Sequence, residues 1–228
     1  MQERLPRCAV CPYEWSQRAC RREDGKAPPN CPTEAHPDLI EQSIEEVQSG
    51  PVCEFARAAS IQEGEGYGDR EKGYGAVRPV KPRILEVIEF SKKMGFRRVA
   101  LIFCIGLRKE ASVVHKIFAD HGLDVISIAC KVGRVPKEVM GLTEDQKVSP
   151  GSFESMCNPI LQARLANHYQ SQFNVLLGLC VGHDSLFFKY AEAPCTVLAV
   201  KDRLLGHNPL AAVYQLDSYY RCLKQPVG

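Results

Sequence analysis

The sequence predicts an α/β fold: a Rossmann-like parallel sheet of about four strands, with helices on both faces and an N-terminal cysteine-rich module. From Lys81 onward, short apolar runs alternate with stretches of helical periodicity, which is typical of a parallel sheet covered on both faces. Before Pro37 the chain has charged residues, prolines and four cysteines, but no run long enough for a core strand. We therefore expect three regions: a metal-binding module (1-37), a helical linker region (38-79) and the α/β domain (80-228).

The linker region predicts two helices and a loop. Asp38 to Gln48 carries apolar residues on one side and ends before Gly50-Pro51, and Val52 to Gln62 forms the second helix. The glycine-rich stretch Gly64 to Pro79 does not follow a strand, so it is interpreted as a flexible loop and not as a phosphate-binding loop.

The α/β domain begins with a helical stripe from Ile84 to Met94 that ends at Gly95. The remaining expected elements, in order, are strand Val99–Cys104, helix Lys109–Asp120, strand Val125–Cys130, helix Asn158–Gln170, strand Val175–Cys180, helix Ser185–Ala191, strand Thr196–Lys201 and helix Pro209–Leu223.

Composition narrows the class of protein. The chain has 228 residues, 45% of them apolar and 25% charged, with a net charge of +2, so it is long enough for a full core. This charge balance predicts no nucleic acid and no membrane partner. The N-terminus has no apolar segment of the secretory type, and the longest apolar run, Val99 to Leu107, is too short to span a bilayer. These features predict a cytoplasmic protein.

Eleven cysteines are many for such a chain. Disulfides are disfavoured in the cytoplasm, where cysteines more often bind metal or react. The alternative is that many are buried small hydrophobes, and we prefer that interpretation for Cys53, Cys195 and Cys222.

The N-terminal group consists of Cys8, Cys11, Cys20 and Cys31. One C-x-x-C pair with two further cysteines supplies the four thiolates of a zinc site or an iron–sulfur cluster. We favour an iron–sulfur cluster and keep zinc as the alternative; a disordered reduced tail is the third possibility.

The second group of cysteines is predicted at the carboxyl ends of the strands of the parallel sheet. Cys104, Cys130 and Cys180 each end an apolar run, and Cys157 opens a helical stretch. The carboxyl ends of parallel strands form the ligand crevice in such sheets, and a thiolate near a helix N-terminus is stabilised by the helix dipole. We expect these four thiols to line a cofactor-binding site.

Charged residues near these thiols are candidates for proton transfer and for binding an anionic group. His183, three residues after Cys180, is a candidate proton carrier. Arg108 and Lys201 follow predicted strands and are candidate partners for an anionic ligand or cluster. A capping or packing role for His183 is the alternative.

Several longer motifs resemble a known family. They include Phe103-Cys104-Ile105-Gly106-Leu107-Arg108, Met156-Cys157-Asn158-Pro159-Ile160 and the segments from Gly178 to Phe187 and from Val200 to Pro209. This pattern is similar to the cysteine-rich family called domain of unknown function 1847, which is often labelled metal-binding. The resemblance covers nearly the whole chain, and it departs most at the Cys11 to Cys20 spacing. It implies metal binding and no particular reaction.

The sequence thus predicts a metal-binding protein, iron–sulfur in our interpretation, whose strand-end cysteines serve redox or thiol-dependent chemistry with a small-molecule substrate or a redox partner. Two alternatives stay open. One is a zinc-stabilised, non-enzymatic binding or redox-sensor protein, and the other is a metal-free thiol enzyme. Whether the protein is an enzyme is not decided by the sequence.

Overall fold

The computed structural model describes residues 5–226, and the chain divides into two compact units, Met1–Glu65 and Gly66–Gly228. The boundary falls inside the predicted linker region of residues 38–79.

The first unit is built from short helices. After two 3-10 turns, Cys8–Val10 and Trp15–Gln17, it continues with α1 (Pro32–Ala35), α2 (Pro37–Val47) and α3 (Gly50–Glu65). The two predicted helices are therefore present as α2 and α3. Among the described residues of this unit only Gln62 is buried, so residues 5–65 include no buried apolar side chain.

The expected loop from Gly64 to Pro79 is partly ordered, so the prediction of a flexible loop was wrong here. β1 (Tyr67–Gly68) pairs antiparallel with β2 (Arg78–Pro79). The Asp69 carboxylate accepts hydrogen bonds from Lys72 at 2.7 Å and from Arg78 at 2.6 Å. These bonds close the connection between the two short strands.

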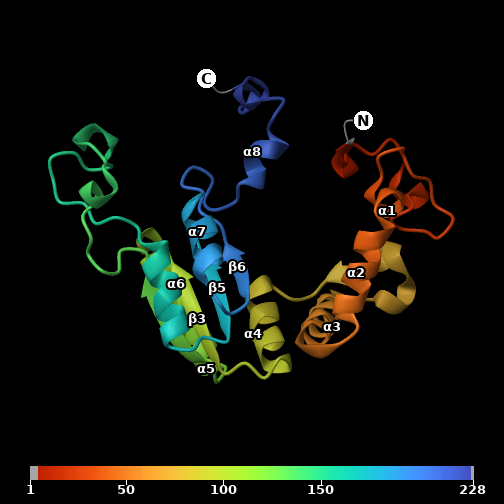
Figure 1. Cartoon of the computed structure of the whole chain (residues 1–228), viewed down its shortest axis with the longest axis horizontal. Helices are drawn as coiled ribbons and strands as arrows, with labels where there is room; N and C mark the ends of the chain where they lie inside the picture. Colours follow the sequence, from red (N-terminus) through yellow and green to blue (C-terminus); the bar gives the residue numbers. More distant parts are fainter. Residues whose placement is uncertain (1–4, 227–228) are drawn as a thin grey trace. The chain divides into compact units, whose positions relative to one another are not determined.

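The second unit contains the predicted parallel sheet. Its elements are α4 (Arg83–Lys93), β3 (Arg98–Phe103), α5 (Arg108–Asp120), β4 (Asp124–Ala129), α6 (Pro159–His168), β5 (Phe173–Leu177), α7 (His183–Tyr190) and β6 (Cys195–Ala199). The strands pair in parallel in the order β4-β3-β5-β6 (Figure 1). The predicted fold class is confirmed.

Helices cover both faces because side chains alternate along each strand. On one face Ala100, Ile102 and Leu176 form a buried cluster with Ala163 of α6 and Phe187 of α7. On the other face, the ring of Phe90 in α4 lies 5.5 Å from that of Phe173 in β5. His115 of α5 is hydrogen-bonded to Ser127 of β4, whose side chain alternates with Ile126 and Ile128. α6 and α7 therefore cover one face, and α4 and α5 cover the other.

Two sequence-based boundaries were wrong. β5 ends at Leu177, not at Cys180, because Gly178 has a φ of +70°, which turns the chain out of the extended conformation. The predicted final helix, Pro209 to Leu223, is reduced to α8 (Leu210–Tyr214) and a separate 3-10 turn (Arg221–Lys224). No residue of α8 is buried, and a short helix without packing is only marginally stable.

Within residues 5–226, no helix combines the length and apolar character needed to cross a membrane.

Candidate functional site: three thiols at the strand ends

Cys104 and Cys130 are held next to each other by the sheet. They directly follow β3 and β4, which are neighbours and pair Phe103 with Ala129. The ladder continues one residue beyond the strands, since the Cys130 N–H donates to the Phe103 carbonyl at 2.9 Å and the Cys104 N–H to that of Leu177 at 3.1 Å. Both cysteines are buried. Their positions therefore depend on the backbone of the sheet.

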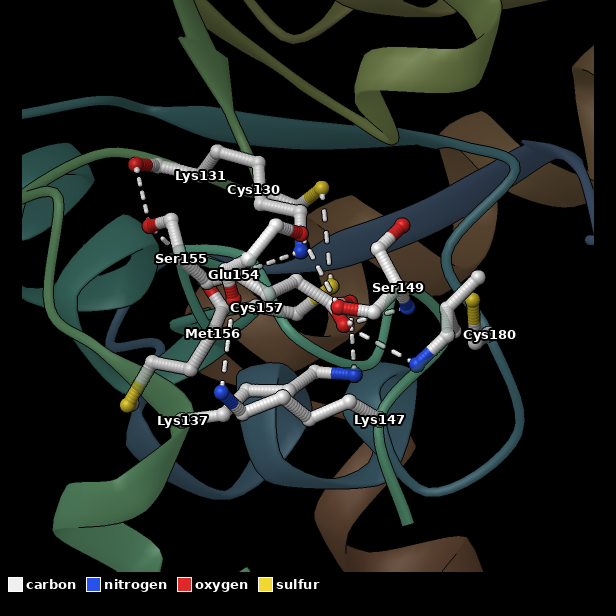
Figure 2. Close-up of polar contacts among 12 residues, drawn as sticks. Cys130, Lys131, Lys137, Lys147, Ser149, Glu154, Ser155, Met156, Cys157 and Cys180 are labelled. Carbon is white, nitrogen blue, oxygen red and sulfur yellow. Dashed lines mark hydrogen bonds and ion pairs between the residues drawn. The ribbon is translucent and has the colours of Figure 1, made fainter. Parts of the chain in front are cut away.

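Cys157 joins them from the start of α6. Asn158 caps this helix by accepting a hydrogen bond from the Leu161 N–H at 3.0 Å, and its own N–H donates to the Cys130 carbonyl at 2.8 Å. The Cys157 Sγ consequently lies 3.8 Å from the Cys130 Sγ (Figure 2). We call Cys104, Cys130 and Cys157 the thiol cluster.

Cys130 is the central member of the thiol cluster. Its thiol is hydrogen-bonded to both Cys104 and Cys157, and these two bonds together with burial raise its pKa. The Ile105 N–H donates to its Sγ at 3.3 Å and opposes that rise. Cys130 is thus the member of the thiol cluster that holds its proton most strongly.

The two outer thiols are acidic. The hydrogen bond from Cys130 lowers the pKa of Cys104 to about 5 against the opposing effect of burial, with help from the Gly106 N–H and the positive charge of Lys201. A second hydrogen bond, between Cys130 and Cys157, lowers the pKa of Cys157 to about 6, and the charges of Lys131 and His183 add to the effect. Both are below the ordinary value of 9.0, so Cys104 and Cys157 are the acidic members of the thiol cluster.

The Lys201 side chain approaches the thiol cluster beside Gly106, which has no side chain. A Cβ added to Gly106 would lie 3.1 Å from the Lys201 Nζ and 3.7 Å from the Cys104 Sγ. The turn after Cys104 therefore has no side chain where the ammonium group and the thiol approach each other. Lys201 follows β6 by two residues and is half-buried.

The other candidates from the sequence lie around this cluster. Cys180 accepts a hydrogen bond from Arg203 at 3.0 Å, and Figure 2 shows its sulfur apart from the Cys130–Cys157 pair. His183 is the first residue of α7, and its charge acts on Cys157. Arg108 is the first residue of α5 and is exposed. Three of the four strand-end cysteines thus come together, and Cys180 has a cationic partner of its own.

The loop between Cys130 and Cys157 is ordered by ion pairs that sequence reasoning missed. The Lys147 side chain is only 2% exposed and contacts the carboxylates of Glu138 and Glu144. Lys137 contacts Glu154 at 2.7 Å, and Glu154 also accepts from the Val148 N–H at 2.9 Å (Figure 2). The mixed charges of this segment were the available signal. The loop returns to the cluster in a fixed conformation without an apolar core of its own.

The N-terminal cysteines line one hollow of the first unit. Cys8, Cys11, Cys20 and Cys31 share it with the cationic residues Arg7, Arg18 and Lys26. The chain closes tightly around the third cysteine, Cys20, because a Cβ on Gly25 would lie 2.4 Å from the backbone of Arg18. All four predicted ligands therefore face a common space lined by positive charge.

Neither group is arranged as a complete metal site. Within residues 5–226, no three side chains of His, Cys, Asp or Glu are placed so that they could hold a metal ion without moving. Binding at either group would require side-chain rotation.

Comparison with known proteins places the chain in a family. Residues 31–198 match the family described as "Protein of unknown function (DUF1847)", so the chain belongs to this family. An uncharacterised protein of Methanocaldococcus jannaschii is 44% identical over 140 residues, which cover 61% of this chain and 69% of that protein. The resemblance found in the sequence motifs is confirmed.

Proposed function

We propose that the protein binds metal and that its strand-end site holds one thiophilic ion through Cys104, Cys130 and Cys157. The observation that carries this proposal is the contact of three thiols from three different elements. The 3.8 Å between the Cys130 and Cys157 sulfurs matches the roughly 3.8 Å expected for two sulfurs bound tetrahedrally to one ion at about 2.3 Å.

The charges around the cluster support the same proposal. A metal ion needs deprotonated ligands, and Cys104 and Cys157 have lowered pKa values of about 5 and about 6. The Cys130 thiol holds its proton most strongly and would have to lose it when the ion binds. When bound, the ion would supply a Lewis acid or a redox centre, and Lys201 would offset part of the negative charge of the thiolates.

A single ion fits the thiol cluster better than a [4Fe–4S] cluster does. In a [4Fe–4S] cluster each iron takes one cysteine, so the ligand sulfurs are spread around the cluster. The 3.8 Å between the Cys130 and Cys157 sulfurs instead matches two ligands of the same metal ion. We propose the N-terminal group as a second site, where the common hollow suits four-thiolate zinc or iron–sulfur binding.

A second candidate function is metal-free thiol chemistry. Cys130 and Cys157 are close enough to form a disulfide after modest side-chain rotation. Two-electron oxidation of the pair by a disulfide substrate would release two thiols from that substrate. A reducing compartment such as the cytoplasm, and a small-molecule substrate or redox partner, belong to both proposals.

The deciding experiment is anaerobic purification of the full chain with analysis of metal and acid-labile sulfide, followed by Co²⁺ titration of the metal-free protein. We expect a thiolate-to-cobalt absorption band whose strand-end contribution is removed by Cys130→Ser. Cys195→Ser is the matched control, because Cys195 is a half-buried cysteine of β6 bonded to Asn174, and it should leave the band unchanged. Cys8→Ser with Cys11→Ser should remove only the N-terminal contribution.

The outcomes separate the candidates. An unchanged cobalt band in Cys130→Ser, or no bound metal in any preparation, would overturn metal binding at the thiol cluster. Thiol chemistry alone would then be supported if the wild type, and not Cys130→Ser, forms the Cys130–Cys157 disulfide on exposure to an oxidised small-molecule disulfide.

A further inference from the structure

Gln162 is a fully buried polar residue beside the thiol cluster. It lies in α6, five residues after Cys157, and its side chain is 0% exposed. No feature of the sequence marks it as functional, since it stands in an ordinary helical stretch.

The amide of Gln162 bonds to both strands that end in the cluster. Its Nε2 donates to the Ile128 carbonyl of β4 at 2.8 Å and to the Phe103 carbonyl of β3 at 3.4 Å. The Phe103 carbonyl also accepts from the Cys130 N–H. One amide group therefore joins three elements, and each of these elements is followed or preceded by one cysteine of the cluster.

Gln162 also leaves a buried acceptor without a partner. Its Oε1 is one of two buried side-chain oxygen or nitrogen atoms in residues 5–226 that make no hydrogen bond. Burying such an atom is unfavourable, and an apolar side chain of similar shape would avoid it. The two Nε2 hydrogen bonds, both near the ends of strands that are followed by a cysteine, are the favourable interactions that offset this cost.

We propose that Gln162 is a positioning residue that sets the distances among the sulfurs of Cys104, Cys130 and Cys157. This inference deepens the proposed function, and it holds for both metal binding and metal-free thiol chemistry. Residues that orient the groups holding a metal typically change its affinity about 10- to 100-fold when they are replaced.

Asn174 provides a matched control. It is also 0% exposed, carries the other unpartnered oxygen, and lies on β5 with its amide donating to Ala193 and Cys195. Its contacts lie away from the thiol cluster. Asn174→Leu and Gln162→Met therefore each remove a buried amide, but only the second removes one that is bonded to the strands of the cluster.

The test uses two measurements on the full chain. The first is Co²⁺ affinity, measured on the part of the absorption band that Cys130→Ser removes. The second is the rate at which dibromobimane, a reagent that bridges two nearby thiols, links Cys130 to Cys157 in the metal-free protein, with the linked peptides identified by mass spectrometry. We expect Gln162→Met to weaken Co²⁺ binding at least about tenfold and to slow the linking reaction, while Asn174→Leu changes neither by more than about twofold.

Gln162→Asn is the second variant if Gln162→Met fails to fold, because it keeps the amide but shortens its reach to the two strands. If the Gln162 variants bind and link like the wild type, or if Asn174→Leu has the same effect as they do, the inference is overturned. If the wild-type strand-end site binds no Co²⁺, the metal proposal fails, and the linking rates alone decide the role of Gln162.

Discussion

The two cysteine groups are held in place by different means. The thiol cluster lies at the end of a sheet whose central strands are largely buried, so its sulfurs are positioned by apolar packing and backbone hydrogen bonds. The N-terminal group stands in a unit whose described residues include no buried apolar side chain. Hydrophobic burial can stabilise the first arrangement without a ligand, but it contributes little to the second. The comparison teaches that metal binding at the sheet would require only side-chain rotation on a backbone that is already in place, whereas at the N-terminus it would also complete the fold.

Metal removal tests this difference between the two cysteine groups most directly, and we expect its effect to be the largest. Chelation, or Cys8→Ser combined with Cys11→Ser, should make the segment before Pro37 sensitive to protease while the unit from Gly66 onward stays resistant. Limited proteolysis with mass-spectrometric mapping measures both in one sample. A metal-free protein that keeps the N-terminal segment protected would show that something other than metal stabilises it.

The same difference explains how much the sequence could predict. Alternating apolar runs identified every strand of the parallel sheet, and the burial of β3 and β5 is the physical reason for that strong signal. The positions of Cys104 and Cys130 follow from those strands. The prediction that Cys180 ends β5 was wrong because Gly178 ends the strand early with a φ of +70°. Whether a glycine adopts such a φ depends on the conformation of its neighbours, which the sequence pattern does not show.

Other features could not be predicted because they depend on tertiary contacts. Gln162 acts through carbonyl groups of two distant strands, and Lys147 is buried by carboxylates of its own loop. Neither contact has a periodic signature along the chain. The geometry of the N-terminal group also depends on groups brought together by a loop without apolar patterning.

Gly178→Ala tests how much the tight packing at the end of β5 stabilises the fold, and we expect a loss of about 3 kcal/mol in the free energy of unfolding. An added Cβ would lie 2.0 Å from Leu107 Cδ1, in addition to the strain of a positive φ. Gly122→Ala is the matched control, since Gly122 has a φ of +83° and open space around the new Cβ; it should cost about 1 kcal/mol. Chemical denaturation monitored by circular dichroism measures both, and equal losses would show that the contact with Leu107 does not matter.

The smallest expected effect is on the pH dependence of single thiols within the second unit. Cys157 and Cys195 are both half-buried, but hydrogen bonding from Cys130 lowers the pKa of Cys157 to about 6, whereas burial raises that of Cys195 above 9.0. Because the thiolate is the reactive form, alkylation of metal-free protein by iodoacetamide should be half-maximal for Cys157 near pH 6 and for Cys195 only above pH 9.

A depressed pKa also means that the ionised Cys157 stabilises the folded state fully above pH 9, and that this contribution is lost as the pH falls toward 6. Cys130→Ser replaces the thiol that makes the largest contribution to the shift, so it should move the Cys157 midpoint upward and leave Cys195 unchanged. Mass-spectrometric quantification of the two peptides across the pH range provides the measurement. Identical profiles for Cys157 and Cys195 would mean that the strand-end thiols are ordinary packing residues, and the contrast between the two cysteine groups would then rest on the N-terminal unit alone.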